Sequence, residues 1–186
     1  KGELLEGLNP NGTAVLNADD PLTVRLAQKA PADILFFGLS DSASIRAEEL
    51  RETPTGTSFT LVLPDKRIPL DLKAPGSFMV LNALGAAAVG YLLGLSAADI
   101  QTGLENFRPV QGRLNIIHTP AGIHIIDDTY NANPASMGAA ICTLKQLKKD
   151  NRAMVVAGDM LELGDQSLSL HEKIGSLAGN SVISGL

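Results

Sequence analysis

The chain has 186 residues, of which 45% are hydrophobic and 19% are charged. This length gives one large domain or two small ones, and the hydrophobic share excludes wholesale disorder. The formal net charge of -5 argues against a nucleic-acid partner, and the single cysteine excludes an internal disulfide, which favours a reducing compartment.

Residues 1–38 alternate between helix and strand patterns. Residues 1–12 (KGELLEGLNPNG) are typical of the tail of a helix that closes into an Asn-Pro-Asn-Gly turn, so we expect the chain to be a piece of a longer protein. Strands are predicted over Thr13–Leu16 and Asp33–Gly38. Between them a helix is predicted to begin at Pro21 with Asp20 as its cap, and one apolar face is expected from Leu22, Leu26 and Ala30.

The pattern changes in residues 45–72, where apolar and polar residues alternate around turn residues and predict antiparallel strands. Val80–Leu95 is apolar but is too short and too rich in glycine to span a membrane, so we expect a buried core helix and no membrane insertion. A second helix is predicted from Ser96, as cap, to about Phe107. Arg108–Gly112 (RPVQG) then breaks the pattern and marks a domain boundary.

After this break the sequence predicts an open α/β sheet. Strands are expected over Ile116–His118 and Ile123–Ile126, followed by a helix from Asn133-Pro134 to about Lys149. Ala153–Ala157 predicts a buried parallel strand, 158–164 a loop, and Ser167 the start of a helix that reaches about Ala178. This sheet has too few units to be complete, so we expect the chain to be interrupted at this end too.

Polar runs follow the last two predicted strands, where open α/β sheets bind their ligands. If these strands are neighbours, four carboxylates surround one crevice: Asp127, Asp128, Asp159 and Glu162. Such a group suits a ribose diol, a magnesium ion or a substrate ammonium. The alternative is that these residues only form turns and helix caps. We favour a functional role for the doublet Asp127-Asp128, and we expect Asn133 to cap a helix in either case.

Two further residues have open interpretations. Arg113, beside Gly112 at the boundary, suits a phosphate between two domains as well as it suits a surface loop. Asn82 lies inside the most apolar helix and needs a partner, which is either the backbone or an adenine edge. His118, His124 and His171 share no metal-ligand spacing, so structural roles are expected. The sequence contains no glycine-rich phosphate-binding motif.

These runs together resemble the Mur ligase family. The matching stretches are KGELLEGL, GTAVLNADDP, APGSFMVLNALGAAA, GRLN, IDDTYNANPASM and AGDMLELG with the following HEKIG, in family order over nearly the whole chain. The resemblance implies an α/β fold: residues 1–113 are the later part of the central ATP-binding domain, with a small antiparallel sheet. Residues 114–186 then open an incomplete Rossmann-like C-terminal domain.

The resemblance also implies a reaction. The run DDTYNANPASM with GDMLELG is similar to the family member that joins D-alanyl-D-alanine to UDP-N-acetylmuramoyl-tripeptide in peptidoglycan precursor synthesis, in the cytoplasm. ATP, with Mg²⁺, phosphorylates a carboxylate, and the amine of the dipeptide attacks the acyl phosphate. Because the phosphate-binding loop lies outside this chain, the chain by itself is expected to be inactive.

Residue by residue, Lys1 matches the lysine that the family carbamylates, and it would support a magnesium ion only in that form. Asn82 matches an adenine contact, Arg113 the arginine that reaches the nucleotide phosphates, and Asp128 the carboxylate near the ribose. Asn131 and Asn133 lie in the stretch expected near the dipeptide.

One position departs from the family pattern. Met79 stands where family members often carry an asparagine. Because methionine cannot donate a hydrogen bond, the resemblance does not carry over this nucleotide contact, and Asn82 remains. The alternative to a ligase is a nucleotide-binding or interaction module without chemistry. The sequence does not define the third residue of the tripeptide or the oligomeric state.

Overall fold

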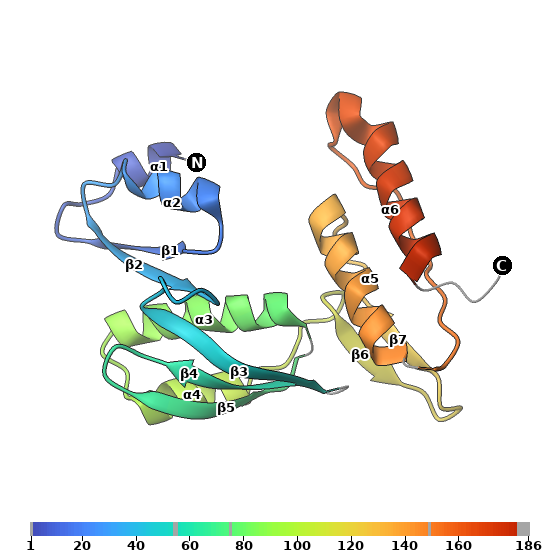
Figure 1. The fold of residues 1–186 in the computed structure, drawn as a ribbon, viewed down its shortest axis with the longest axis horizontal. Coiled ribbons are helices and arrows are strands. Elements are labelled where there is room, and N and C mark those ends of the chain that lie inside the picture. Colours follow the sequence, from blue (N-terminus) through green and yellow to red (C-terminus); the bar gives the residue numbers. More distant parts are fainter. Residues whose placement is uncertain (1, 54–55, 75, 149, 182–186) are drawn as a thin grey trace. The chain divides into compact units, whose positions relative to one another are not determined.

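The computed structural model describes residues 2–53, 56–74, 76–148 and 150–181, and the chain divides into two compact units, 1–107 and 108–186 (Figure 1). The division falls at the start of the Pro/Gly break that the sequence marks as a boundary. The assignment of residues 1–113 and 114–186 to two family domains stays a prediction.

The first unit is built on one five-stranded sheet with the strand order β1-β2-β3-β4-β5. β1 to β3 pair in parallel, and β3 to β5 pair antiparallel, which confirms the antiparallel pattern expected for residues 45–72. β3 joins the parallel and antiparallel parts into one sheet, because its start pairs with the end of β2, Ile45 with Phe37. The bounds are Thr13–Asn17 (β1), Asp33–Gly38 (β2), Ile45–Thr53 (β3), Gly56–Val62 (β4) and Arg67–Leu72 (β5).

The long helix of this unit, α3, provides the centre of its core. α3 contacts β1, β2, β3 and β4, and it buries residues at helical spacing (Figure 1). Val80 and Leu84 are fully buried against Ile45 and Leu61 of the sheet. The predicted core helix is thereby confirmed, and none of the helices in the described residues is long and apolar enough to cross a membrane. The helices of the unit are Gly2–Glu6 (α1), Pro21–Ala27 (α2), Ser77–Leu92 (α3) and Ala97–Glu105 (α4).

Both predicted helix caps in this unit are confirmed. The Asp20 carboxylate accepts the Leu22 N–H at 2.9 Å, and the Ser96 hydroxyl accepts the Asp99 N–H at 3.2 Å. The prediction that Leu22, Leu26 and Ala30 form one apolar face of α2 is wrong, since Leu22 is 63% exposed and Ala30 lies beyond the helix. The helix ends early because the Ala30 N–H bonds the carbonyl three residues back, as in a turn.

The carboxylate of Asp19 ties together the ends of two parallel strands. It accepts the N–H groups of Leu39 at 2.6 Å and Ser40 at 3.0 Å, just after β2. Gly38 leaves room for this contact, because a Cβ there would lie 2.8 Å from the Asp19 oxygens. Burial of Asp19 opposes its charge, but the hydrogen bonds from Leu39 and Ser40 outweigh that effect and hold its pKa below the usual value.

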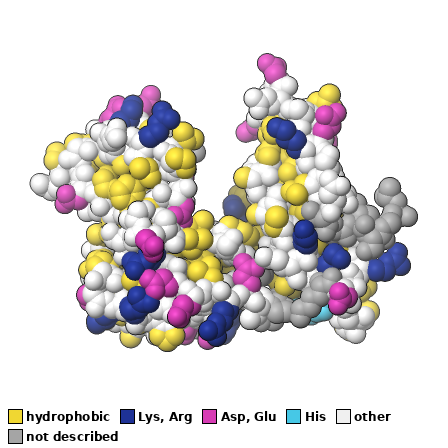
Figure 2. All heavy atoms as spheres, in the orientation of Figure 1, with side chains coloured by type: hydrophobic (Ala, Val, Ile, Leu, Met, Phe, Trp, Pro, Cys, Tyr) yellow, Lys and Arg dark blue, Asp and Glu magenta, His cyan; other side chains and the backbone are white. Residues whose placement is uncertain are grey.

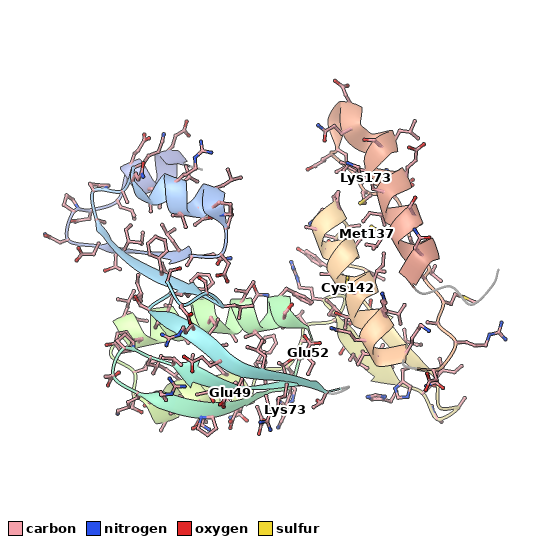
Figure 3. All side chains as sticks on the ribbon, in the orientation of Figure 1. Glu49, Glu52, Lys73, Met137, Cys142 and Lys173 are labelled. Carbon is pink, nitrogen blue, oxygen red and sulfur yellow. The ribbon has the colours of Figure 1, made fainter. Side chains whose placement is uncertain are left out.

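The second unit contains a hairpin and two packed helices. β6 (Asn115–His118) and β7 (His124–Asp127) pair antiparallel, and the helices are α5 (Pro134–Lys148) and α6 (Ser167–Ser181), with a 3₁₀ turn before α6. These elements confirm the predicted strands and the start of both helices. Ile141 of α5 packs on Ala178 of α6. Figure 3 shows Met137 and Cys142 on α5 and Lys173 on α6.

The strand expected over Ala153–Ala157 does not form, so this prediction is wrong. Ala153 and Val155 pack on the α5–α6 cluster, whereas Met154 is 81% and Val156 91% exposed. An apolar run of this kind is typical of a strand covered on both faces. Here only one face is covered, and no strand is assigned to residues 154–163.

The Asp19 contact yields a prediction about stability. Because its folded-state pKa is lowered, ionised Asp19 stabilises the fold above the usual pKa, and this contribution disappears as the pH falls through the folded-state pKa. We expect Asp19→Asn to lower the urea midpoint at about pH 7, with a smaller difference from wild type at about pH 3. Asp65→Asn, which changes the same charge at an exposed position of the β4–β5 turn, is the control and is expected to leave the midpoint unchanged. An equal effect of both variants would contradict this role of Asp19.

Candidate functional site

The candidate site is built around a short loop that begins the second unit. Gly112 and Leu114 both have left-handed backbone conformations, with φ of 76° and 49°, and both are buried. Such a φ is strained for leucine and requires support from the surroundings. Arg113, between them, donates its N–H to the Val110 carbonyl at 3.0 Å.

The acidic doublet at the end of β7 provides that support. Asp127 accepts the Gly112 N–H and Asp128 accepts the Leu114 N–H, each at 3.1 Å. The Tyr130 N–H donates in turn to the Gly112 carbonyl at 3.0 Å. We call these three hydrogen bonds the loop clamp. They fix the backbone on both sides of Arg113, whose side chain is exposed.

The two carboxylates of the doublet are used differently. Asp127 accepts the Thr129 hydroxyl at 2.7 Å and the Thr129 N–H at 3.3 Å with one oxygen, and the Gly112 N–H with the other. The bond from the Thr129 hydroxyl is the main reason that the pKa of Asp127 lies below its usual value, although desolvation opposes it. Asp128 uses only Oδ1 within the described part of the chain, so its second oxygen is available to a ligand.

Arg113 lies over an aromatic ring. Its guanidinium carbon is 4.1 Å from the centroid of the Tyr130 ring, which is itself 68% exposed. A cation at this distance is attracted by the face of the ring. The planar guanidinium therefore has a preferred position but keeps donors for an anionic ligand.

Two asparagines follow on the way into α5. Asn133 caps the helix, since its side-chain oxygen accepts the N–H groups of Ala135 at 3.0 Å and Ser136 at 2.9 Å. This confirms the cap expected from the sequence. The Asn131 side-chain oxygen accepts the Ala132 N–H at 2.9 Å. Both oxygens are thus used by the protein, and the side-chain NH₂ groups remain as donors.

These side chains line one polar pocket within the second unit. Four of the pocket residues are ones that the sequence analysis singles out: Arg113, Asp128, Asn131 and Asn133. Two others, Tyr130 and Ser136, are not predicted from the sequence. Tyr130 lies inside the DDTYNAN run, so an aromatic ring between the acidic doublet and the asparagines was the available signal. The pocket is lined by Gly112, Arg113, Asp128, Tyr130, Asn131, Asn133 and Ser136.

Other predicted site residues lie elsewhere. Asp159 and Glu162 do not line this pocket, so the expectation of four carboxylates around one crevice is wrong. It required residues 153–157 to form a strand beside β7, and that strand is absent. The described residues contain no group of three or more His, Cys, Asp or Glu side chains placed to hold a metal.

The loop that carries Asp159 is held by His171 of α6. The imidazole accepts the Met160 N–H at Nε2 (2.9 Å) and bonds the Ser167 carbonyl through Nδ1 (2.8 Å). The ring is therefore the tautomer that carries its proton on Nδ1. This is the structural role that the sequence predicts for His171.

Asn82 and Lys1 belong to the first unit. Asn82 is exposed on α3, and its side-chain NH₂ lies 3.9 Å from the Met79 sulfur. Because the helix turns this position toward solvent, the amide needs no partner within the protein, and the adenine contact stays a prediction. An exposed amide is open to a ligand. Lys1 lies outside the described residues.

The clamp predicts a difference between two glycines with the same φ. A Cβ at Gly112 would lie 3.2 Å from the Tyr130 backbone nitrogen, whereas a Cβ at Gly122 (φ 77°) would meet nothing within 4 Å. Gly122→Ala is expected to cost about 1–2 kcal/mol of unfolding free energy from backbone strain alone. Gly112→Ala is expected to cost more, since it also displaces a clamp residue. Urea denaturation of both variants measures the difference, and equal costs would contradict the clamp.

Two family models match the chain. A model described as the Mur ligase middle domain matches residues 1–90, and one described as the Mur ligase glutamate ligase domain matches residues 112–183. Among curated proteins, the UDP-N-acetylmuramoyl-tripeptide–D-alanyl-D-alanine ligase of Haemophilus influenzae is 36% identical over 94% of this chain and 37% of its own length. The Escherichia coli ligase of the same name is 35% identical over 96% of this chain and 39% of its own length.

Solved structures give the same result. A crystal structure of MurF from Acinetobacter baumannii matches with a TM-score of 0.87 and 36% identity, over 96% of this chain and 39% of that one. MurF from Thermotoga maritima in complex with ADP matches with a TM-score of 0.81 and 26% identity, over 94% and 40%. The chain thus spans well under half the length of these relatives. Its mixed α/β fold is that of the Mur ligases, and the chain belongs to the Mur ligase family.

Proposed function

We propose that this chain is part of an ATP-dependent ligase that joins D-alanyl-D-alanine to UDP-N-acetylmuramoyl-tripeptide through an acyl phosphate. The observation that carries the proposal is the polar pocket, which brings together Arg113, Asp128, Asn131 and Asn133. The names of the relatives that are about a third identical over nearly the whole chain support this choice of substrates. Residues 1–113 then belong to the central ATP-binding domain and residues 114–186 to the C-terminal domain.

The pocket residues fit ATP by their chemistry. The Arg113 guanidinium offers a planar pair of donors to phosphate oxygens, and the second oxygen of Asp128 can accept from ribose hydroxyls. Asn82, exposed on α3, would contact the adenine. ATP supplies the phosphoryl group that activates the tripeptide carboxylate. Arg113 binds and neutralises the negative charge of the phosphates, with its backbone already held by the loop clamp.

The two asparagines fit the incoming dipeptide. Each asparagine offers its side-chain NH₂ group as a donor, since the Asn133 oxygen already accepts two backbone N–H groups and the Asn131 oxygen accepts one. Donors suit the terminal carboxylate of D-alanyl-D-alanine rather than its amine. We therefore assign Asn131 and Asn133 to orientation of the dipeptide, with its amine left free to attack.

The described residues do not by themselves make a magnesium site. Asp128 is the only carboxylate in the pocket, and the oxygens of Asp127 are occupied by clamp and turn hydrogen bonds. Mg²⁺ is commonly held by one or two carboxylates together with substrate phosphates. We propose that it enters with the nucleotide, with Lys1 as a supporting group only if carbamylated.

We also propose a cytoplasmic location, which the single cysteine supports because disulfide-free chains are typical of a reducing compartment. The net charge of -5 supports the absence of a nucleic-acid partner.

The decisive experiment uses the full-length parent protein. Phosphate release from ATP is measured with UDP-N-acetylmuramoyl-tripeptide, with and without D-alanyl-D-alanine. Release that depends on the dipeptide supports the ligase. ADP binding without dipeptide-dependent release would favour the alternative, a nucleotide-binding or interaction module without chemistry.

Variants of the pocket test the residue assignments in the same assay. Arg113→Ala is expected to lower kcat/KM by about 10²- to 10³-fold, because a preorganised cation is lost from the phosphates. Asp128→Asn keeps an oxygen for the Leu114 N–H but loses the charge, and we expect mainly a raised KM for ATP. Arg152→Ala, an exposed arginine outside the pocket, is the matched control. If both pocket variants stayed within a few-fold of wild type, the assignment would be wrong.

A further inference from the structure

The β6–β7 hairpin carries a pair of histidines at its turn. His118 and His124 are register partners, the last pair before the loop. The Thr119 N–H bonds the Ile123 carbonyl at 2.9 Å, so alternation along the ladder makes His118 and His124 a non-hydrogen-bonded pair. The side chains of such pairs lie close together on one face of the sheet.

The two imidazoles meet through the same atom of each ring. Their Nδ1 atoms are 2.6 Å apart, and the rings are edge-on, with centroids 4.6 Å apart and planes at 88°. Both residues are exposed, and histidine reaches the surface of the second unit (cyan in Figure 2). In this contact one ring donates its Nδ1 proton to the lone pair of the other. Two imidazole nitrogens thus converge on one point that solvent can reach.

We propose that His118 and His124 form a two-ligand site for a divalent transition metal such as Cu²⁺, Ni²⁺ or Zn²⁺. Imidazole nitrogen is a preferred ligand of these ions and a poor one for Mg²⁺. This site is separate from the polar pocket, whose residues do not include either histidine. Metal binding by this pair does not depend on the proposed ligase activity.

Metal binding requires a small rearrangement of the pair. Ligand distances of about 2.0–2.1 Å place two nitrogens on one ion roughly 3 Å apart, so the rings must separate by a few tenths of an ångström. The ring that now donates shifts its proton from Nδ1 to Nε2, which exposes a second lone pair without net proton release. Water completes the coordination. The identity of the ion sets the affinity, and Cu²⁺ is expected to bind more tightly than Ni²⁺.

The fixed backbone makes this pair more than two independent surface histidines. The loop between them is closed by the Thr119–Ile123 bond and by the Gly122 N–H to the Thr119 carbonyl at 3.0 Å. Because the strands hold both side chains on one face, little freedom is lost when both bind one ion. A bound ion would join β6 to β7 at the turn end, whereas Asp127 pairs with Asn115 at the other end.

The test is a calorimetric titration of the tag-free 186-residue chain with CuCl₂, NiCl₂ and MgCl₂. Cys142 is exposed on α5 (Figure 3) and is a second soft ligand, so all proteins carry Cys142→Ser. We expect one site for Cu²⁺ and a weaker one for Ni²⁺, with no heat from Mg²⁺. Saturating Ni²⁺ is expected to raise the thermal midpoint of unfolding by several degrees, since it binds only the folded hairpin.

Single and double variants locate the site. His118→Gln and His124→Gln are each expected to weaken Ni²⁺ binding at least tenfold and to remove the thermal shift. The double variant keeps His171, so binding that remains in it belongs to another site. Far-UV circular dichroism without metal checks that each variant is folded. Absence of binding in the protein that carries Cys142→Ser alone, or an unchanged affinity in either single histidine variant or in the double variant, would overturn the proposal.

Discussion

The candidate site depends on two carboxylates that accept backbone N–H groups from a loop more than ten residues earlier. Asp127 and Asp128 bond the amides of Gly112 and Leu114, which lie on either side of Arg113 and both have positive φ. Without these acceptors, two buried amides and a strained leucine would lack compensation. The clamp therefore fixes where the arginine backbone lies, and the Tyr130 ring limits where its guanidinium goes. The two pocket residues at the start of the unit, Gly112 and Arg113, are thereby joined to the segment that runs from the end of β7 into α5 and supplies the other pocket residues.

This arrangement gives each member of the acidic doublet a separate task. Both oxygens of Asp127 accept hydrogen bonds from Gly112 or Thr129, so its role is to position the loop. Asp128 holds Leu114 with one oxygen and presents the other to the pocket. The two asparagines divide their groups in a similar way: their side-chain oxygens accept backbone N–H groups, and their NH₂ groups remain as donors for a ligand. Several side chains of the site thus hold the local backbone and also offer groups to a ligand. In particular, the interpretation of Asn133 as a helix cap and its interpretation as a ligand residue are compatible.

Much of the fold follows from local sequence signals. The caps Asp20, Ser96 and Asn133 and the alternation in residues 45–72 predict most elements near their observed bounds, because caps and side-chain periodicity act within a few residues. Long-range pairing was not predictable in the same way. The apolar run Ala153–Ala157 predicts a buried strand, but burial depends on neighbours that a local pattern does not reveal. For the same reason the grouping of Asp159 and Glu162 with the doublet fails. The sequence and the family resemblance single out Arg113, Asp128, Asn131 and Asn133, whereas the hydrogen bonds that bring them to one pocket depend on the pairing of β6 with β7.

Amide hydrogen exchange of the Gly112 and Leu114 N–H groups, followed by NMR in the 186-residue chain, tests the clamp most directly. If the carboxylates hold the loop, both amides are protected in the wild type. Asp127→Ala removes the protection of Gly112 first, and Asp128→Ala removes that of Leu114. Exchange of both wild-type amides at the rate of an unstructured peptide would contradict the account, because Arg113 would then have no fixed position in the pocket.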